Sequence, residues 1–274
     1  MDKLYPSRPH AAWGRSVFLG ALLSLLVALP GYAAINLSPA EAARIGRKIW
    51  QNECNGTVAG LTSWNSGEDF ASLGIGHFIW YQKGKRGPFD ESFPPLVRFV
   101  SSQGAKLPEV LQGEKAHHCP WRSRQEFEAA RQSPEMKQLR QFLVDTINLQ
   151  TQFLVNRLDN ALPKMLARTA PENRSRVQQK FERLTKSAQG CYALIDYVNF
   201  KGEGVLPTER YRDQGWGLLQ VLEQMKDSDS DAVKEFSRSA AEVLTRCVRN
   251  SPPARNEARW LSGWISRVNS YSRA

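Results

Sequence analysis

The sequence predicts an α+β fold in which helices predominate, with a small β-hairpin lobe and a larger helical lobe on either side of a cleft. Three observations support this: an amphipathic helical pattern ends at Glu53, glycine-punctuated strand-like runs follow over 61–77, and helical periodicity dominates 121–274. A small sheet beside packed helices is typical of the α+β class. We expect one domain over 34–274, with helix, hairpin and loop in 34–120 and the helical lobe in 121–274.

The first helix is defined by its start signal and by one apolar face. Ser38 and Glu41 form a capping box, and Pro39 takes the first helical position. The apolar face carries Ala42, Ile45 and Ile49, and it continues to Glu53. A carboxyl group on this face is partly desolvated, which raises its pKa and suits a general acid. The alternative is a solvated glutamate at the helix end, the commoner place for this residue type.

A short hairpin is expected directly after this helix. Asn65-Ser66-Gly67 is a turn signal between two strand-like runs, and Phe78 to Tyr81 completes the small sheet. A carboxyl group that faces such a hairpin across a cleft suits cleavage of a glycosidic bond.

The 274-residue chain has a formal net charge of +10, which indicates an anionic partner such as anionic lipid or cell wall. The sequence contains no recognised nucleic-acid-binding motif, so we expect no nucleic-acid partner.

Residues 1–33 are typical of an export signal. Lys3, Arg8 and Arg15 precede or flank the apolar segment 17–30, and small residues follow it. We therefore expect a periplasmic or secreted protein. The alternative is an uncleaved N-terminal anchor, with transient membrane association through 17–30.

Four cysteines fit two disulfides in an oxidising compartment, and three connectivities are open. We favour Cys54–Cys119 and Cys191–Cys247, because each pair stays within one half of the chain. His117-His118-Cys119 lacks a second spaced ligand pair, so we expect no metal and no cofactor.

The chain between the hairpin and the helical lobe is expected to be a long loop over 82–120, with a short helical patch at 107–111. Ser133-Pro134-Glu135 then opens a long helix that is broken near Pro163. Further helices are expected from Pro171 to Leu184, from Gln214 to Met225 and from Ala232 to Cys247.

The string Ser72-Leu73-Gly74-Ile75-Gly76-His77 resembles the Thr-Ile-Gly-Tyr/Ile-Gly-His signature of the phage-type lysozymes, muramidases that cut peptidoglycan. The resemblance implies a lysozyme-like fold. It matches Glu53 to the family's glutamate at the end of the first helix, and Ser72 to its hairpin threonine. The two residues are farther apart here than in the family.

The family's second acid has no direct match, because Ser66 stands at its position. Glu68 and Asp69 are nearby acids, and Glu68 is the candidate that we retain. The site expected from the resemblance comprises catalytic Glu53, Glu68 and Ser72, and substrate-binding Trp64, Gly74, His77 and Arg255.

Arg255 enters this set through the C-terminal region. Residues 191–204 resemble the family's central helix, and 250–255 with 260–264 resemble its Thr-Pro-Asn-Arg and Gly-Thr-Trp segments. In the family this arginine approaches the catalytic glutamate, which implies that Arg255 holds Glu53. The alternative is a surface arginine at a helix start.

A rival site lies at Glu203, which is followed by Gly215-Trp216-Gly217-Leu218-Leu219-Gln220-Val221. This pattern resembles the Glu…Gly-Leu-Met-Gln signature of soluble lytic transglycosylases. The same apolar residues also fit a plain buried helix face.

Three functions follow from these observations. The first is a peptidoglycan glycosidase in which Glu53 protonates the leaving oxygen of the glycan strand. The alternatives are a lytic transglycosylase that forms anhydro-muropeptides, and a non-catalytic protein that binds cell-wall glycan on a lysozyme scaffold.

Overall fold

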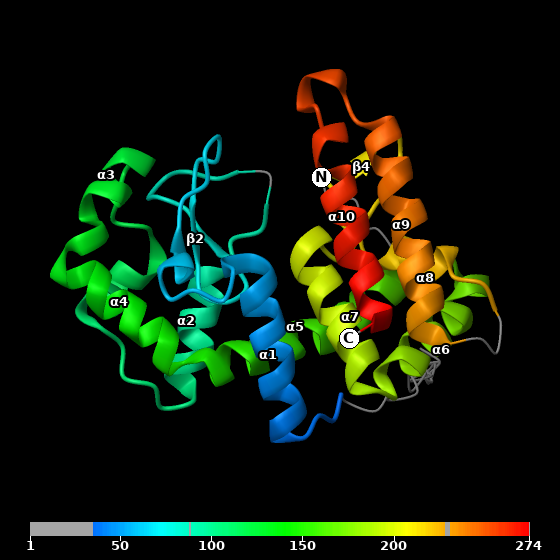
Figure 1. Cartoon of the computed structure of the whole chain (residues 1–274), viewed down its shortest axis with the longest axis horizontal. Helices are drawn as coiled ribbons and strands as arrows, with labels where there is room; N and C mark the ends of the chain where they lie inside the picture. The colour runs from blue at the N-terminus through cyan, green and yellow to red at the C-terminus, as the bar shows by residue number, and fades with distance from the viewer. Residues whose placement is uncertain (1–34, 88, 228–230, 274) are drawn as a thin grey trace, which may run out of the picture. The chain divides into compact units, whose positions relative to one another are not determined.

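The chain is mostly helical and carries a small antiparallel sheet, as a computed structural model shows for residues 35–87, 89–227 and 231–273 (Figure 1). The predicted export signal lies outside the described residues. The helices are α1 (Pro39–Cys54), α2 (Phe93–Ser102), α3 (Arg124–Ala129), α4 (Pro134–Asp145), α5 (Ile147–Arg168), α6 (Arg174–Thr185), α7 (Ala188–Lys201), α8 (Leu218–Gln224), α9 (Ala232–Asn250) and α10 (Ala258–Ser270).

Helix α1 begins and ends where the sequence predicts. The backbone N–H of Ser38 donates to Glu41 Oε2 at 2.9 Å, and the backbone N–H of Glu41 donates to Ser38 Oγ at 3.3 Å. Ile45 and Ile49 are buried on the face that packs against α5 and α7. Asn55 ends the helix in the left-handed conformation, at φ 53°.

The predicted hairpin and third strand are confirmed. Strands β1 (Thr62–Ser63), β2 (Ala71–Leu73) and β3 (Phe78–Trp80) pair antiparallel in the order β1-β2-β3. In this register Ser72 lies opposite both Ser63 and Ile79. A second, two-stranded sheet pairs β4 (Arg210–Tyr211) with β5 (Gln214–Gly215).

The expectation of a loop throughout 82–120 is wrong, because α2 lies within it. Phe93, Leu96, Val97 and Val100 recur at helical spacing and are all buried. Two prolines, Pro94 and Pro95, obscure this pattern, yet proline is tolerated in the first turn of a helix. Helix α2 packs against β3 and α5, so it supports one edge of the sheet.

The long helix is broken at Thr146, and the predicted break near Pro163 is wrong. The hydroxyl of Thr146 donates to the carbonyl of Phe142 at 2.7 Å. Gln150 Nε2 donates to the carbonyl of Leu143 at 2.6 Å and to Thr146 Oγ1 at 3.0 Å. The Gln150 side chain thus satisfies the carbonyl of Leu143, which a continuous helix would pair with a backbone N–H, whereas Pro163 lies inside α5.

Two helices that follow residue 120 contact the sheet region. Helices α3 and α4 pack with the sheet, since Trp64 stacks edge-on against Phe127 at 5.8 Å and Arg140 donates to Thr62 Oγ1 at 3.1 Å. Helix α5 contacts α1, α2 and α4 as well as α6 and α7. The neighbours of α5 therefore change along its length, from α2 and α4, which lie with the sheet, to α6 and α7. All of these elements belong to one compact unit, residues Ala34–Ala274.

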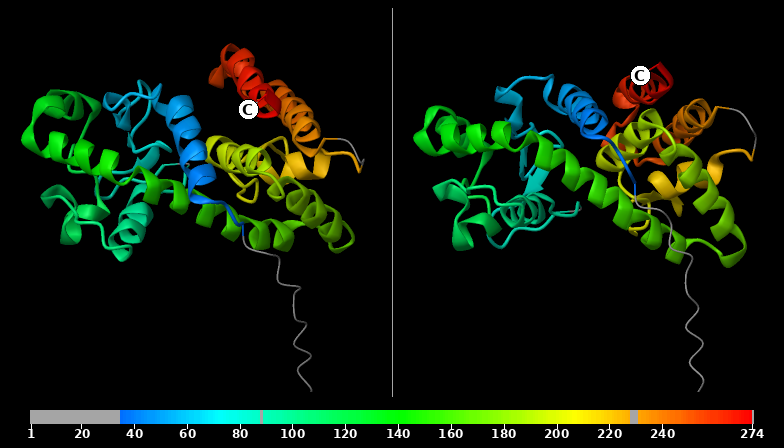
Figure 2. Two further views of the ribbon diagram at one scale, coloured as in Figure 1. Left: turned by 60° about the horizontal axis from the view of Figure 1, so that its bottom comes forward. Right: turned by 90° about the horizontal axis from the view of Figure 1, so that it is seen from below.

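The last two helices, α9 and α10, lie side by side (Figures 1 and 2). The chain turns back between them over residues 251–257, so the two helices run antiparallel (Figure 1). Within the described ranges, every helix is too short or too polar to cross a lipid bilayer.

Neither predicted disulfide is formed, because all four cysteines are free. Cys54 Sγ instead contacts the carbonyl oxygen of Gly74 at 3.4 Å. Cys119 forms an isolated parallel β-bridge with Gln82. Burial raises the thiol pKa to about 12 for Cys54, Cys119 and Cys247, and to about 11 for Cys191. The cysteines act as small buried groups in the core.

Candidate active site

The loop Gly74–His77 is fixed between two helices. Gly74 has φ 70°, and a Cβ there would collide with Gln150 Oε1 of α5. The backbone N–H of Ile75 donates to that same oxygen at 2.9 Å, and Asn199 Nδ2 of α7 donates to the carbonyl of Gly76 at 3.1 Å. The glycine-rich motif is therefore what lets the backbone approach α5 and α7 closely.

Glu53 lies at the end of α1 and faces this loop. Its side chain is 15% exposed. Oε1 accepts hydrogen bonds from Asn199 Nδ2 at 3.2 Å and from an Nη of Arg267 at 2.6 Å. Oε2 lies 3.7 Å from His77 Nδ1, which is too long for a direct hydrogen bond. Glu53 is thus held through one oxygen, while the other points towards the loop.

Arg267 of α10 connects Glu53 to a second, deeper carboxylate. Its Nε and Nη donate to both oxygens of Asp196 at 2.8 Å, and its guanidinium lies 4.3 Å from the ring centroid of Phe200. Burial acts to lower the pKa of Arg267, but the charges of Asp196 and Glu53 outweigh it and raise that pKa above its usual value. Arg267 therefore stays a fixed cation.

Asp196 is completely buried and accepts four hydrogen bonds. Besides the two from Arg267, Asn52 Nδ2 donates to it at 3.0 Å and the Tyr271 hydroxyl donates at 2.6 Å. Burial and the Asp196 charge raise the pKa of Tyr192, a second partner of Asn52, to about 12. These four bonds occupy the hydrogen-bond acceptor positions of Asp196, so none remains to activate a water molecule. The role of Asp196 is therefore to position Arg267.

We call Glu53, Asp196, Arg267, His77 and Asn199 the Glu53 cluster. With both carboxyl groups ionised, Glu53, Asp196 and Arg267 carry one net negative charge. Arg267 is thus shared between the buried Asp196 and the more exposed Glu53.

His77 presents a neutral imidazole to Glu53. Burial lowers the pKa of His77, and this outweighs the opposing attraction of Glu53. Its Nε2 lies 3.3 Å from the carbonyl oxygen of Gly60, which can only accept, so Nε2 carries the ring proton. The lone pair of Nδ1 therefore faces Glu53.

The other two predicted catalytic residues form no hydrogen bond or ion pair with Glu53 in the described part of the chain. Ser72 is buried in β2, at 3% exposure. Glu68 lies in the loop between β1 and β2, where Asn65 Nδ2 donates to it at 3.0 Å. Burial raises the pKa of Glu68, and the bond from Asn65 opposes this only in part. The role of Glu68 as second acid stays a prediction.

Two of the predicted substrate-binding residues have structural roles. Trp64 is 4% exposed, and its indole N–H donates to the carbonyl of Glu68 at 2.8 Å, so no ring face is open to a sugar. Gly74 is buried and serves the close approach to α5. Their roles in substrate binding stay predictions, as does that of His77.

The expected role of Arg255 is wrong. Its guanidinium lies 3.6 Å from Glu257, whereas Arg267 is the arginine that contacts Glu53. The two arginines are separated by twelve residues along one C-terminal segment. Sequence spacing did not reveal which of them turns towards α1.

The rival acid Glu203 is engaged elsewhere. Lys164 Nζ donates to its Oε1 at 2.8 Å. Burial lowers the pKa of Arg157, and the negative charge of Glu203 opposes this lowering only in part. Two cations thus act on Glu203. Both cations belong to α5, so the contacts of Glu203 lie outside the hydrogen-bonded network of Glu53.

Sequence reasoning missed Arg267, Asp196 and Asn199. A signal for Asp196 was present, because it interrupts the apolar run Ala193–Val198 within a buried helix. A buried acid needs a cationic partner, and several arginines follow in the C-terminal helices. The sequence does not say which of them it is.

Two cavities in the described chain lie elsewhere. One of about 900 Å³ lies between α9 and α10, and one of about 430 Å³ lies beside residues 205–213. Neither is lined by Glu53, His77 or Arg267, so a cleft over Glu53 stays a prediction. Over the described ranges, no group of three or more His, Cys, Asp or Glu side chains is arranged to hold a metal ion.

The chain matches no protein-family model, and comparisons with curated proteins and with solved structures find no significant match.

Proposed function

We propose that this protein is a peptidoglycan glycosidase with a lysozyme-like fold, in which Glu53 is the general acid. One observation supports this most directly. Glu53 lies at the end of the first helix, is largely shielded from solvent, and faces the loop of the Gly-Ile-Gly-His motif. The resemblance to phage-type lysozymes implies the same placement.

The chemistry assigned to each residue follows from its contacts. Glu53 donates its proton to the leaving glycosidic oxygen, and the positive charge of Arg267 then stabilises the carboxylate that remains. Asp196 fixes Arg267 in a bidentate pair. Asn199 ties Glu53 to Gly76, so the acid and the loop keep one spacing.

Charge and composition agree with a cell-wall substrate. The net charge of +10 attracts a polyanion over a long range. An export signal, as the sequence predicts, would bring the protein to such a substrate.

A lytic transglycosylase is the second candidate, and one observation favours it. Glu53 is the solvent-accessible carboxyl group of its cluster, since Asp196 is buried and fully bonded. A site with one usable acid favours attack by the sugar's own hydroxyl over attack by activated water. Were Glu68 to activate water, hydrolysis would result, with inversion if the two carboxyl groups are roughly 6.5–9.5 Å apart.

Mass spectrometry of purified sacculi after digestion tests these alternatives. We expect soluble muropeptides from the wild type and none from Glu53→Gln. Glu109→Gln, at an exposed and distant acid, should retain full activity. Reducing ends would identify a hydrolase, and anhydro ends a transglycosylase. Saturable binding to sacculi without any soluble product would reject both and leave a glycan-binding protein.

A further inference from the structure

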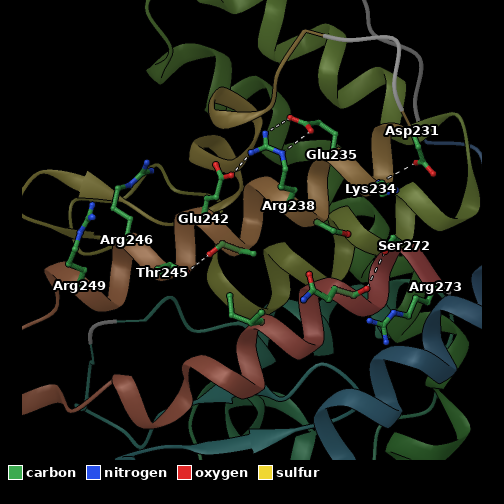
Figure 3. Close-up of a pocket in the computed structure, with 14 residues that line it drawn as sticks. Asp231, Lys234, Glu235, Arg238, Glu242, Thr245, Arg246, Arg249, Ser272 and Arg273 are labelled. Atoms are coloured by element: carbon green, nitrogen blue, oxygen red, sulfur yellow. Dashed lines mark hydrogen bonds and ion pairs between the residues drawn. The ribbon is translucent and has the colours of Figure 1, made fainter.

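The antiparallel pair α9 and α10 forms a groove that the proposed reaction does not use. It is the cavity of about 900 Å³ described above (Figure 3). The α10 residues that line it, such as Ile265 and Asn269, lie on the opposite face of that helix from Arg267. The α9–α10 groove is thus separate from the Glu53 cluster.

The charges at the centre of the groove are paired with one another and leave one net negative charge. Arg238 forms ion pairs with both Glu235 and Glu242, and these pairs lie together in Figure 3. Ala241 and Ile265 are the two apolar residues that line the groove. This part of the surface therefore offers apolar contact area next to paired charges.

Both ends of the groove are cationic. Arg246 and Arg249 lie at one end, and Lys234 and Arg273 at the other (Figure 3). In the described residues none of these four forms an ion pair with a carboxylate. The remaining acid of the groove, Asp231, is used as the helix cap, where it accepts from the backbone of Val233 at 2.9 Å.

Arg246 provides a second, independent sign of an absent partner. Its Nε is buried and has no hydrogen-bond acceptor in the described chain. Its Nη1 makes only a 3.4 Å bond to Gln224. A buried N–H without an acceptor is costly, and a bound carboxylate would satisfy it.

We propose that the α9–α10 groove binds an amphipathic helix of a partner protein that carries acidic residues at both ends of its apolar face. From Lys234 to Arg249 the groove extends over roughly 22 Å, the length of about 15 helical residues. A third helix laid between two antiparallel helices is a common mode of recognition, with apolar anchors at the centre.

Charge complementarity distinguishes this occupant from others. The chain's own residues 1–34 contain Lys3, Arg8 and Arg15 against Asp2, so they are cationic and would be repelled. A second copy of the chain also carries a net charge of +10. An acidic helix is attracted to both ends of the groove.

The test uses the full chain and a synthetic helical peptide of about 15 residues, with two glutamates near each end and leucines along one face. Fluorescence anisotropy at low ionic strength should show saturable binding. Lys234→Gln combined with Arg249→Gln should weaken it about tenfold, and Ile265→Glu should abolish it. Lys106→Gln with Lys137→Gln, two exposed lysines elsewhere, is the charge-matched control and should bind as the wild type does.

A peptide with the same glutamates but glutamine in place of leucine should not bind. If that peptide bound as tightly as the leucine peptide, the groove would recognise negative charge alone, and the proposal would be overturned. No binding of the leucine peptide, or no effect of the groove variants, would also overturn it. A dimer in sedimentation that Ile265→Glu dissolves would show that a second copy occupies the groove. Muropeptide release is unaffected by these variants, so this test is separate from that of the proposed function.

Discussion

The Glu53 cluster and the α9–α10 groove both contain several charged side chains around an arginine, but their charges are paired to different extents. In the cluster, Arg267 binds two carboxyl groups and Asp196 accepts four hydrogen bonds. In the groove, four cations have no ion pair in the described chain, and Arg246 has a buried N–H without an acceptor. A complete network fixes one geometry, as catalysis needs, whereas unpaired charges at a surface are free to meet a partner.

This contrast makes its strongest prediction for Asp196. Asp196→Ala leaves Arg267 buried without its main counter-charge, so we expect a loss of about 3–5 kcal/mol in the free energy of unfolding. Urea denaturation measures this loss. Asp69→Ala, at an exposed acid in the hairpin loop, is the control and should change stability by less than about 0.5 kcal/mol. Equal stability of the two variants would mean that the cluster does not organise the fold.

Gly74→Ala tests the loop that Glu53 faces. The residue has a positive φ, and the new methyl group would also press on buried Gln150. Backbone strain and overpacking together should cost about 3 kcal/mol. Gly67→Ala has a similar φ of 85° but open space around it, so it should cost only about 1 kcal/mol. If both variants lost the same stability in urea titrations, the contact with α5 would be unimportant.

His77 makes the free energy of unfolding depend on pH, and the direction of this dependence follows from its pKa. Its pKa is lowered on folding, so the unfolded chain binds the proton more readily. The contribution of His77 to stability is therefore fully present above about pH 6.5, and it is lost as the pH falls through the folded-state value. His77→Asn, which tolerates the positive φ of 48°, should remove this part of the pH dependence of Tm. Parallel curves for wild type and variant would contradict the assignment.

The smallest effect is expected in the groove. Arg249→Gln removes an exposed cation without an ion pair, so the free energy of unfolding should change by less than about 0.5 kcal/mol in either direction. Urea denaturation checks this directly. A loss comparable to that of Asp196→Ala would show that the groove cations hold the fold together, which would remove the contrast between the two regions.

Local signals predicted the parts of the fold that depend on neighbouring residues. The capping box at Ser38, the Asn65-Ser66-Gly67 turn and the amphipathic α9 each specify an element through short-range contacts. Helix α2 was missed because Pro94 and Pro95 obscured a helical pattern that tolerates them in its first turn. The break at Thr146 depends on Gln150 reaching back to the preceding turn, which periodicity does not reveal.

The candidate site was predicted in part. Glu53 and His77 follow from a helix end and a short motif, and the structure brings them together. Arg267 is 214 residues from Glu53 along the chain, and its choice over Arg255 depends on how α10 packs on α7 and α9. The disulfides were wrong because cysteine count carries no information about the distance between the side chains.

The most direct test of the central claim compares the rates at which Glu53→Gln and Glu203→Gln release muropeptides from purified sacculi. Glutamine keeps the shape of each side chain but cannot donate the proton. We predict that Glu53→Gln loses activity by at least about 100-fold, the typical contribution of a general acid, while Glu203→Gln stays within a few-fold of the wild type. Loss of activity in Glu203→Gln with full activity in Glu53→Gln would contradict the assignment of Glu53 as the proton donor.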